Sequence, residues 1–173
     1  LIPLDKDNQG NEKTNYLTHE KVTFNAGFST SNTSGKLDNT KFIITMPAEY
    51  IKLDTPDDYT DDDGIQLSRL DSADHGPDLQ LVDGNWVITY TYNDIPGGYS
   101  GDVPISIRTV MGDTPNGYKL PITVKVVDKD GNTLTNGETT KEFTFKTEPP
   151  KHRKRIGVGN DILDIGERTI EKF

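Results

Sequence analysis

The densest set of carboxylates in the sequence is a run of three aspartates followed by Gly64, and its chemistry is that of a site for a hard cation. Carboxylate oxygens next to a glycine that permits a sharp turn are typical calcium ligands. An EF-hand does not fit, because tyrosine and leucine occupy the first and twelfth positions of the register that Gly64 would fix. The run therefore indicates either a solvated acidic loop or a looser calcium site formed by Asp61, Asp62 and Asp63.

The histidines and serines offer no arrangement typical of catalysis. His19, His75 and His152 are far apart in the sequence and have no metal-ligand spacing. The neighbouring residues Asp74 and His75 resemble only part of a catalytic triad. Both lie in a polar stretch that is typical of a solvated loop. The segment 98–101 misses the G-x-S-x-G spacing by one residue, and no helix follows it. We therefore expect no enzyme activity and no required cofactor, with calcium as the one candidate.

Aromatic side chains are the next candidates, because their rings can stack on sugars. Trp86, Tyr90 and Tyr92 alternate in phase with Ile88, which predicts that they face a core. Tyr99 lies in a turn outside that alternation. It is therefore the candidate ligand-binding residue.

The elements that must position these residues are strands, because apolar residues alternate with polar ones in short segments bounded by Gly, Pro, Asn and Asp. No amphipathic helical pattern lies between them. About eight strands without helices predict an all-β fold, an antiparallel β-sandwich. The expected strands are Lys21–Phe28, Phe42–Met46, Ile65–Ser68, Leu79–Val82, Trp86–Tyr92, Val103–Ile107, Tyr118–Val126 and Phe143–Phe145.

Several local signals refine this expectation. Asp83-Gly84 predicts a type I′ hairpin, since both central positions of that turn need positive φ. Asp128–Asn132 predicts a second hairpin turn. The alternation near Arg108 suggests a bulge that would turn Val110 inward. Pro121, which has no N–H for a sheet ladder, predicts an edge position or a bulge.

Charge and composition limit the partners. The 28 acidic and 19 basic residues give a net charge of -9, which disfavours nucleic acid as a partner. Zero cysteines exclude disulfides, thiolate metal sites and cysteine nucleophiles. No apolar stretch is long enough to span a membrane. The basic cluster Lys151–Arg155 suggests a solvated linker, a segment that docks onto the acidic body, or a site for a polyanion.

Composition also divides the chain. Residues 1–16 are polar and predict a lead-in segment, residues 17–149 a β-sandwich module, and residues 150–173 a linker with the start of a following module. The chain begins at Leu1 with no targeting signal. We therefore expect a fragment of a longer protein.

Short motifs over residues 16–149 resemble those of a known family. Lys21–Phe28 followed by Ser31–Pro47 is a strand, a Ser/Thr/Asn-rich loop and a second strand ending in proline. Ile95–Ile105, Thr114–Tyr118 and Val127–Leu134 are similar to the second half of the same kind of module. These motifs and the composition around them resemble the Ig-like modules of cell-wall-anchored surface proteins of Gram-positive bacteria, which include MSCRAMM-like adhesins.

This resemblance implies an Ig-like sandwich, displayed outside the cell and anchored to the wall through other regions. It implies a module that binds a host or matrix protein or glycan, or that spaces a binding tip from the wall beside neighbouring modules. One alternative is a carbohydrate-binding module of a secreted polysaccharide-active enzyme. Another is a hydrolase with two catalytic carboxylates, whose separation is set by the fold and not by the sequence spacing.

The family also suggests an intramolecular isopeptide bond, for which Lys21 and Lys41 are the candidate lysines. The expected last strand has no asparagine to pair with either of them, since residues 141–147 contain none. The cross-link therefore stays a minority hypothesis, which an intact mass lower by one ammonia would support.

Overall fold

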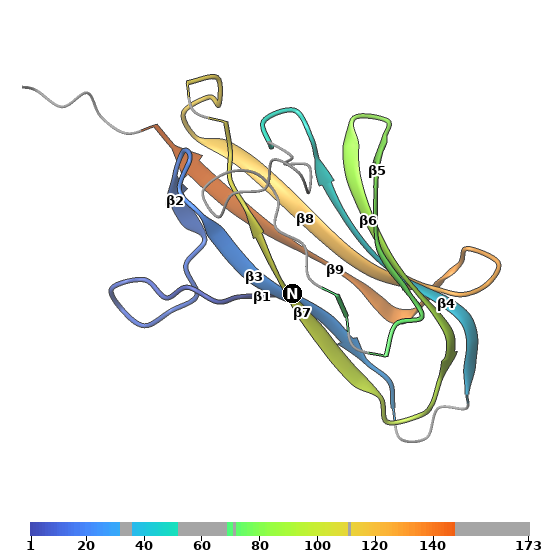
Figure 1. Cartoon of the computed structure of the whole chain (residues 1–173). Helices are drawn as coiled ribbons and strands as arrows, with labels where there is room; N and C mark the ends of the chain where they lie inside the picture. The colour runs from blue at the N-terminus through green and yellow to red at the C-terminus, as the bar shows by residue number, and fades with distance from the viewer. Residues whose placement is uncertain (32–35, 52–68, 71, 111, 148–173) are drawn as a thin grey trace, which may run out of the picture.

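The computed structural model describes residues 1–31, 36–51, 69–70, 72–110 and 112–147, and this part of the chain contains strands and no helix (Figure 1). This part of the chain therefore has no helix that is long and apolar enough to cross a membrane. The nine strands are β1 (Ile2–Pro3), β2 (Asn15–Leu17), β3 (Val22–Ser29), β4 (Leu37–Pro47), β5 (His75–Val82), β6 (Asn85–Ile95), β7 (Ser100–Ile107), β8 (Tyr118–Val127) and β9 (Thr133–Lys146).

Two sheets pack face to face. The smaller has the order β1-β3-β7, and the larger has the order β2-β9-β8-β4-β6-β5. Every pairing is antiparallel except β2 with β9, which is parallel. The predicted all-β, mostly antiparallel sandwich is therefore confirmed, with nine strands in place of about eight. β1 and β2 both begin within residues 1–16, the expected lead-in segment, so this segment supplies one short strand to each sheet.

The core lies between the two sheets and follows from the alternation. In β3, Val22, Phe24 and Ala26 are fully buried, while the residues between them are partly exposed. Phe24 meets Phe143 of β9 across the interface, with ring centroids 6.1 Å apart. Burying one such side chain contributes about 1.5–3 kcal/mol, so β3 packing over β8 and β9 holds the sheets together.

The two predicted hairpin turns are confirmed. Asp83 and Gly84 have φ values of 50° and 79°, as a type I′ turn between β5 and β6 requires. In the turn between β8 and β9, Asp128 Oδ1 accepts the N–H groups of Asp130 at 2.9 Å and Asn132 at 3.0 Å. These side-chain bonds add to two backbone bonds of the turn, which the Asp128 N–H donates to the Asn132 carbonyl and the Gly131 N–H donates to the Asp128 carbonyl.

The expected bulge near Arg108 is wrong. The alternation of β7 continues without a slip to Thr109, which is fully buried, whereas Val110 is partly exposed. The buried hydroxyl of Thr109 is satisfied, because it accepts the N–H of His19 at 2.9 Å. A polar residue therefore takes the inward position that Val110 was expected to fill.

Pro121 occupies a one-sided position on an interior strand. β4 pairs with β8 only over Thr123–Val127, so at Pro121 β8 has a partner on one side only, Glu142 of β9. A proline is tolerated there, since no ladder bond to β4 is lost. Pro121 therefore has a neighbouring strand on one side only, as expected for an edge position, although β8 itself is an interior strand of the sheet.

The last strand, β9, is longer than predicted, and several predicted segments lie outside the described residues. β9 begins ten residues earlier than expected, at Thr133, and its first half carries exposed polar residues rather than an alternating apolar face. The expected strand at residues 65–68, the acidic run, the basic cluster and the whole of residues 150–173 lie outside the described residues.

The packing of β9 gives a stability prediction. Phe143→Ala should lower the free energy of unfolding by about 3–5 kcal/mol, because it leaves a cavity among Phe24, Tyr16 and their neighbours. Lys146→Ala, an exposed position on the same strand, should change it by less than about 0.5 kcal/mol. Urea unfolding followed by fluorescence measures both, and equal losses would contradict this description of the core.

Candidate binding groove

An open groove of about 570 Å³ lies at one end of the sandwich, between the two sheets. The end of β3 and the start of β4 form one wall, and the β8–β9 hairpin forms the other. Its apolar lining is Phe28, Leu37, Phe42, Val124, Val126 and Leu134. The volume is within the range of natural ligand sites.

The groove lies beyond the part of β3 that pairs with β1. β1 has only two residues and pairs with β3 at Phe24 and Asn25. Beyond them, no strand in the described part of the chain continues the smaller sheet on this side. β2 likewise covers β9 only from Thr144 to Lys146. The inner face of the larger sheet is therefore left uncovered near Thr139, which lies opposite the buried Val124.

A cluster of aromatic rings is centred on Phe28, and two of its members, Phe28 and Phe42, line the groove, whereas Tyr92 and Tyr99 lie behind them. The Phe28 ring lies 5.2 Å from Phe42, 5.5 Å from Tyr92 and 5.3 Å from Tyr99, measured between centroids. The hydroxyl groups of Tyr92 and Tyr99 share a hydrogen bond of 3.1 Å. Such ring pairs stabilise beyond the area they bury, so the cluster keeps this wall rigid.

Tyr99, the predicted ligand-binding residue, belongs to this cluster. Its side chain is partly buried, and its backbone exchanges hydrogen bonds with Thr30: the Tyr99 carbonyl accepts the Thr30 N–H, and Thr30 Oγ1 accepts the Tyr99 N–H, both at 2.8 Å. Tyr99 thus joins the end of β3 to the start of β7. Tyr90 and Tyr92 are fully buried and Trp86 is partly buried, as the alternation predicts.

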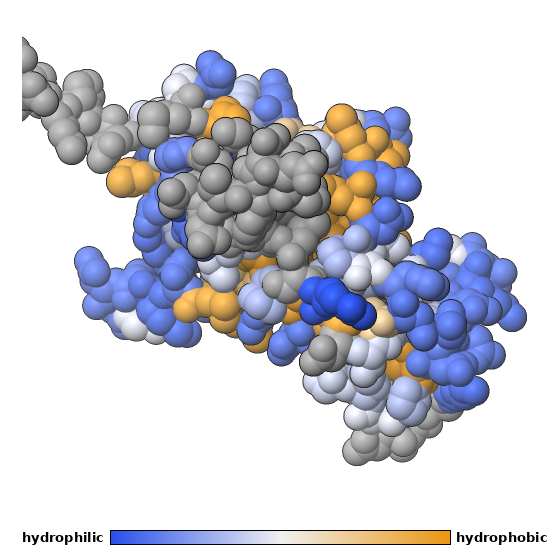
Figure 2. Space-filling model, in the orientation of Figure 1, coloured by the Kyte–Doolittle hydropathy of each residue, from blue (hydrophilic) through white to orange (hydrophobic). Residues whose placement is uncertain are grey.

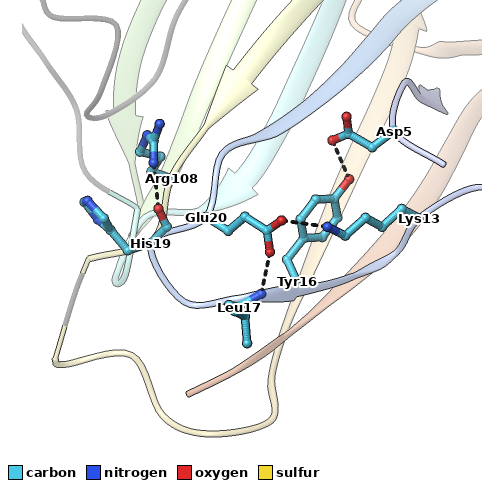
Figure 3. Close-up of polar contacts among 7 residues, drawn as sticks. All are labelled: Asp5, Lys13, Tyr16, Leu17, His19, Glu20 and Arg108. Atoms are coloured by element: carbon cyan, nitrogen blue, oxygen red, sulfur yellow. Dashed lines mark hydrogen bonds and ion pairs between the residues drawn. The ribbon is translucent and has the colours of Figure 1, made fainter. Parts of the chain in front are cut away.

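Polar contacts hold the N-terminal arm, residues 1–17, against the core of the sandwich (Figure 3). Lys13 Nζ forms an ion pair with Glu20 at 2.6 Å and lies 4.5 Å from the centre of the Tyr16 ring. The Tyr16 hydroxyl donates to Asp5 at 3.0 Å. Because Tyr16 packs on Phe143, these contacts seat the arm on the core.

The electrostatics of this arm are balanced locally. Burial raises the pKa of Glu20, but the hydrogen bonds from Lys13 and from the Leu17 N–H, with the charge of Lys13, outweigh it and lower that pKa overall. Lys141 of β9 makes a second ion pair, at 2.8 Å, with Glu12. Two adjacent residues of the arm, Glu12 and Lys13, are therefore tied to the body of the sandwich.

The remaining candidates do not converge on one site. His19 lies in the turn before β3, where its carbonyl accepts from Arg108 at 2.8 Å, and His75 is exposed at the start of β5 (Figure 3). Within residues 1–31, 36–51, 69–70, 72–110 and 112–147, no three His, Cys, Asp or Glu side chains gather as metal ligands. Asp61, Asp62, Asp63 and His152 lie outside those ranges, so the calcium hypothesis stays a prediction.

Lys41, a candidate for the isopeptide bond, is exposed on β4, opposite Thr91 and Val127 of the neighbouring strands. The groove itself was not anticipated from the sequence. The one local signal for it is Phe28, an apolar residue at the very end of a predicted strand.

No family model matches the sequence, and no curated protein matches it. Among solved structures, the cohesin module of a family 33 glycoside hydrolase from Clostridium perfringens matches 79% of this chain and 93% of its own, with 12% identity and a TM-score of 0.46. The major pilin subunit of Bacillus cereus matches 76% of this chain and 37% of its own, with 11% identity and a TM-score of 0.37.

A third solved structure, AvmM, which catalyses macrocyclization in alchivemycin A biosynthesis, matches 80% of this chain and 86% of its own, with 12% identity and a TM-score of 0.38. The chain is thus a β-sandwich with a distant similarity to a cohesin module and to a Gram-positive pilin subunit.

The buried tyrosines predict instability at alkaline pH. Burial raises the pKa of Tyr90 to about 12, whereas an unfolded chain loses that proton near pH 10. Between these values the unfolded state binds fewer protons, so the free energy of unfolding falls as the pH rises, by about 1 kcal/mol per pH unit for this tyrosine. Burial, followed by the bond to Tyr99, raises the pKa of Tyr92 in the same direction.

Urea unfolding at a series of pH values from about 8 to 12 measures this loss. Tyr90→Phe should make the decline above pH 10 less steep while leaving the stability below pH 9 within about 1 kcal/mol of the parent. A decline equally steep in both proteins would show that Tyr90 does not contribute to it.

Proposed function

We propose that this chain is a non-enzymatic extracellular module of a bacterial cell-surface adhesin, which binds a host or matrix protein or glycan or spaces a binding tip from the cell wall. The observation that carries the proposal is the open apolar groove between the sheets. Three of its apolar side chains, Phe28, Leu37 and Leu134, are only partly buried, so a partner that covers them would remove apolar surface from water.

The chemistry of the groove favours binding over catalysis. The charged residues along it are Lys125 and Glu138, which lie opposite each other on β8 and β9. The alternation places both on the outer face of the sheet, whereas Val124 and Thr139 face inward. What a partner meets inside the groove is therefore apolar surface with a few hydroxyl groups, which is typical of sites that hold a ligand by burial.

The composition suits the proposed setting. With no cysteine in the sequence, the fold is held by packing and sheet hydrogen bonds alone, which function equally well outside the cell. Most of the face shown in Figure 2 is hydrophilic, with apolar side chains gathered in patches between polar ones. A hydrated surface and a net charge of -9 keep such a module soluble at high local density.

Two variants on adjacent residues of β9 test the proposal. Thr139→Arg places a long charged side chain in the groove, and Thr140→Arg places the same side chain on the outer face beside Thr123. The whole chain is tested on a panel of matrix proteins and on a glycan array, with calcium and with a chelator. We expect binding by the parent chain, at least about tenfold weaker binding by Thr139→Arg, and unchanged binding by Thr140→Arg.

Equal binding by the two variants would remove the groove as the site. No binding by the parent chain would leave the spacing role alone, and turnover of a bound glycan or protein would contradict a non-enzymatic module.

A further inference from the structure

The sequence contains two Asn-Gly pairs, Asn116-Gly117 and Asn136-Gly137, and the structure places them in different surroundings. Asparagine followed by glycine is prone to deamidation, because glycine has no side chain to hinder attack of its backbone nitrogen on the asparagine amide. The attack needs an accessible amide and a backbone that can move. The two pairs can therefore be compared within one molecule.

The pair Asn116-Gly117 is held by two hydrogen bonds. The side-chain carbonyl of Asn116 accepts the N–H of Thr147 at 3.1 Å, and the N–H of Gly117 donates to the Phe145 carbonyl at 2.7 Å. The amide that would be attacked and the nitrogen that would attack it are thus both bound to the end of the β9 segment. Deamidation at Asn116 must first break these bonds.

The pair Asn136-Gly137 lies in an irregular part of the β8–β9 hairpin. Between two regular pairs of the ladder, β9 has four residues, 134–137, where β8 has Val126 alone. The additional residues form a bulge, in which the ladder does not fix each backbone group. Asn136 is exposed there and has a φ of 58°. Its amide is therefore accessible, and the backbone beside it is less constrained than in a regular strand.

We propose that Asn136 is a modification site, at which the chain deamidates without an enzyme. The Gly137 nitrogen loses its proton to solvent base and attacks the side-chain carbonyl carbon of Asn136. The bond from that carbon to the side-chain nitrogen breaks, and the nitrogen leaves as ammonia. The cyclic succinimide then takes up one water and opens to aspartate or isoaspartate. The net reaction exchanges one ammonia for one water, so no oxidant or cofactor takes part.

The bulge allows the sheets to stay intact after the reaction. Isoaspartate lengthens the backbone by one carbon, which in a regular ladder would shift every pair beyond it. At Asn136, β9 already has more residues than its partner strand, so the added carbon changes the bulge and leaves the ladder on either side in register.

The reaction adds a negative charge at the edge of the groove, since Asn136 and Gly137 line it beside Glu138. The conversion itself does not depend on the proposed function, whereas its effect on a partner in the groove does. There the new carboxylate repels acidic groups of a partner, so that aged and newly made copies of the module differ in what they bind.

Peptide mapping of the whole chain tests the proposal. The folded protein is incubated at mildly alkaline pH, which favours loss of the glycine N–H proton, and trypsin then places the two pairs in separate peptides, 109–119 and 130–141. Asn136 should be converted at least about tenfold faster than Asn116, to both aspartate and isoaspartate. A sample digested without incubation corrects for conversion during the digest.

Incubation in urea is the matched control, because it removes the structure and keeps the sequence. The two pairs should then be converted at rates within about threefold of each other. Asn136→Gly, which suits the positive φ at this position, should remove most of the acidic species that accumulates in the folded parent chain.

Equal rates at Asn116 and Asn136 in the folded protein would overturn the proposal, and so would an Asn136 that is converted only in urea. The converted protein, separated by anion exchange, should unfold at the same urea concentration as the parent chain. A clearly lower midpoint would show that the bulge does not absorb the added carbon. None of these readouts involves a matrix protein or a glycan, so failure of the proposed function would leave the modification site in place.

Discussion

The structure depends on the burial of the inner face of β3 against β8 and β9. The smaller sheet has only one full-length neighbour for β3, namely β7, so it has little stability apart from this contact. Phe24 packing on Phe143, with Tyr16 beside it, makes up the centre of the interface. How far this burial extends along the strands decides which end of the sandwich is closed and where the groove lies.

Burial is complete at one end of the sandwich and incomplete at the other. Where Tyr16 and the ion pair of Lys13 with Glu20 seat the N-terminal arm, the gap between the sheets is closed. Beyond the residues that pair with β1, the groove opens between the sheets, and the Phe28 ring packs in a cluster with Phe42, Tyr92 and Tyr99.

Much of the fold could be predicted from local patterns, because alternation and turn chemistry are local properties. Val22 to Phe28 and Asp83-Gly84 needed no knowledge of the rest of the chain. Thr109 was missed because its burial depends on a hydrogen bond to His19, which is 90 residues away in the sequence. The groove was missed for a similar reason: no residue in it is unusual, and it forms only where the end of β3 and the β8–β9 hairpin, far apart in the sequence, lie side by side.

The one parallel pairing among the described strands, β2 beside β9, has a mechanical consequence. Tension applied between the N-terminal arm and the end of β9 pulls these two neighbours in opposite directions along their own axes. The hydrogen bonds between Asn15–Leu17 and Thr144–Lys146 are then strained together rather than one after another. A module stretched in this way resists in shear, because the bonds of this ladder bear the load at the same time.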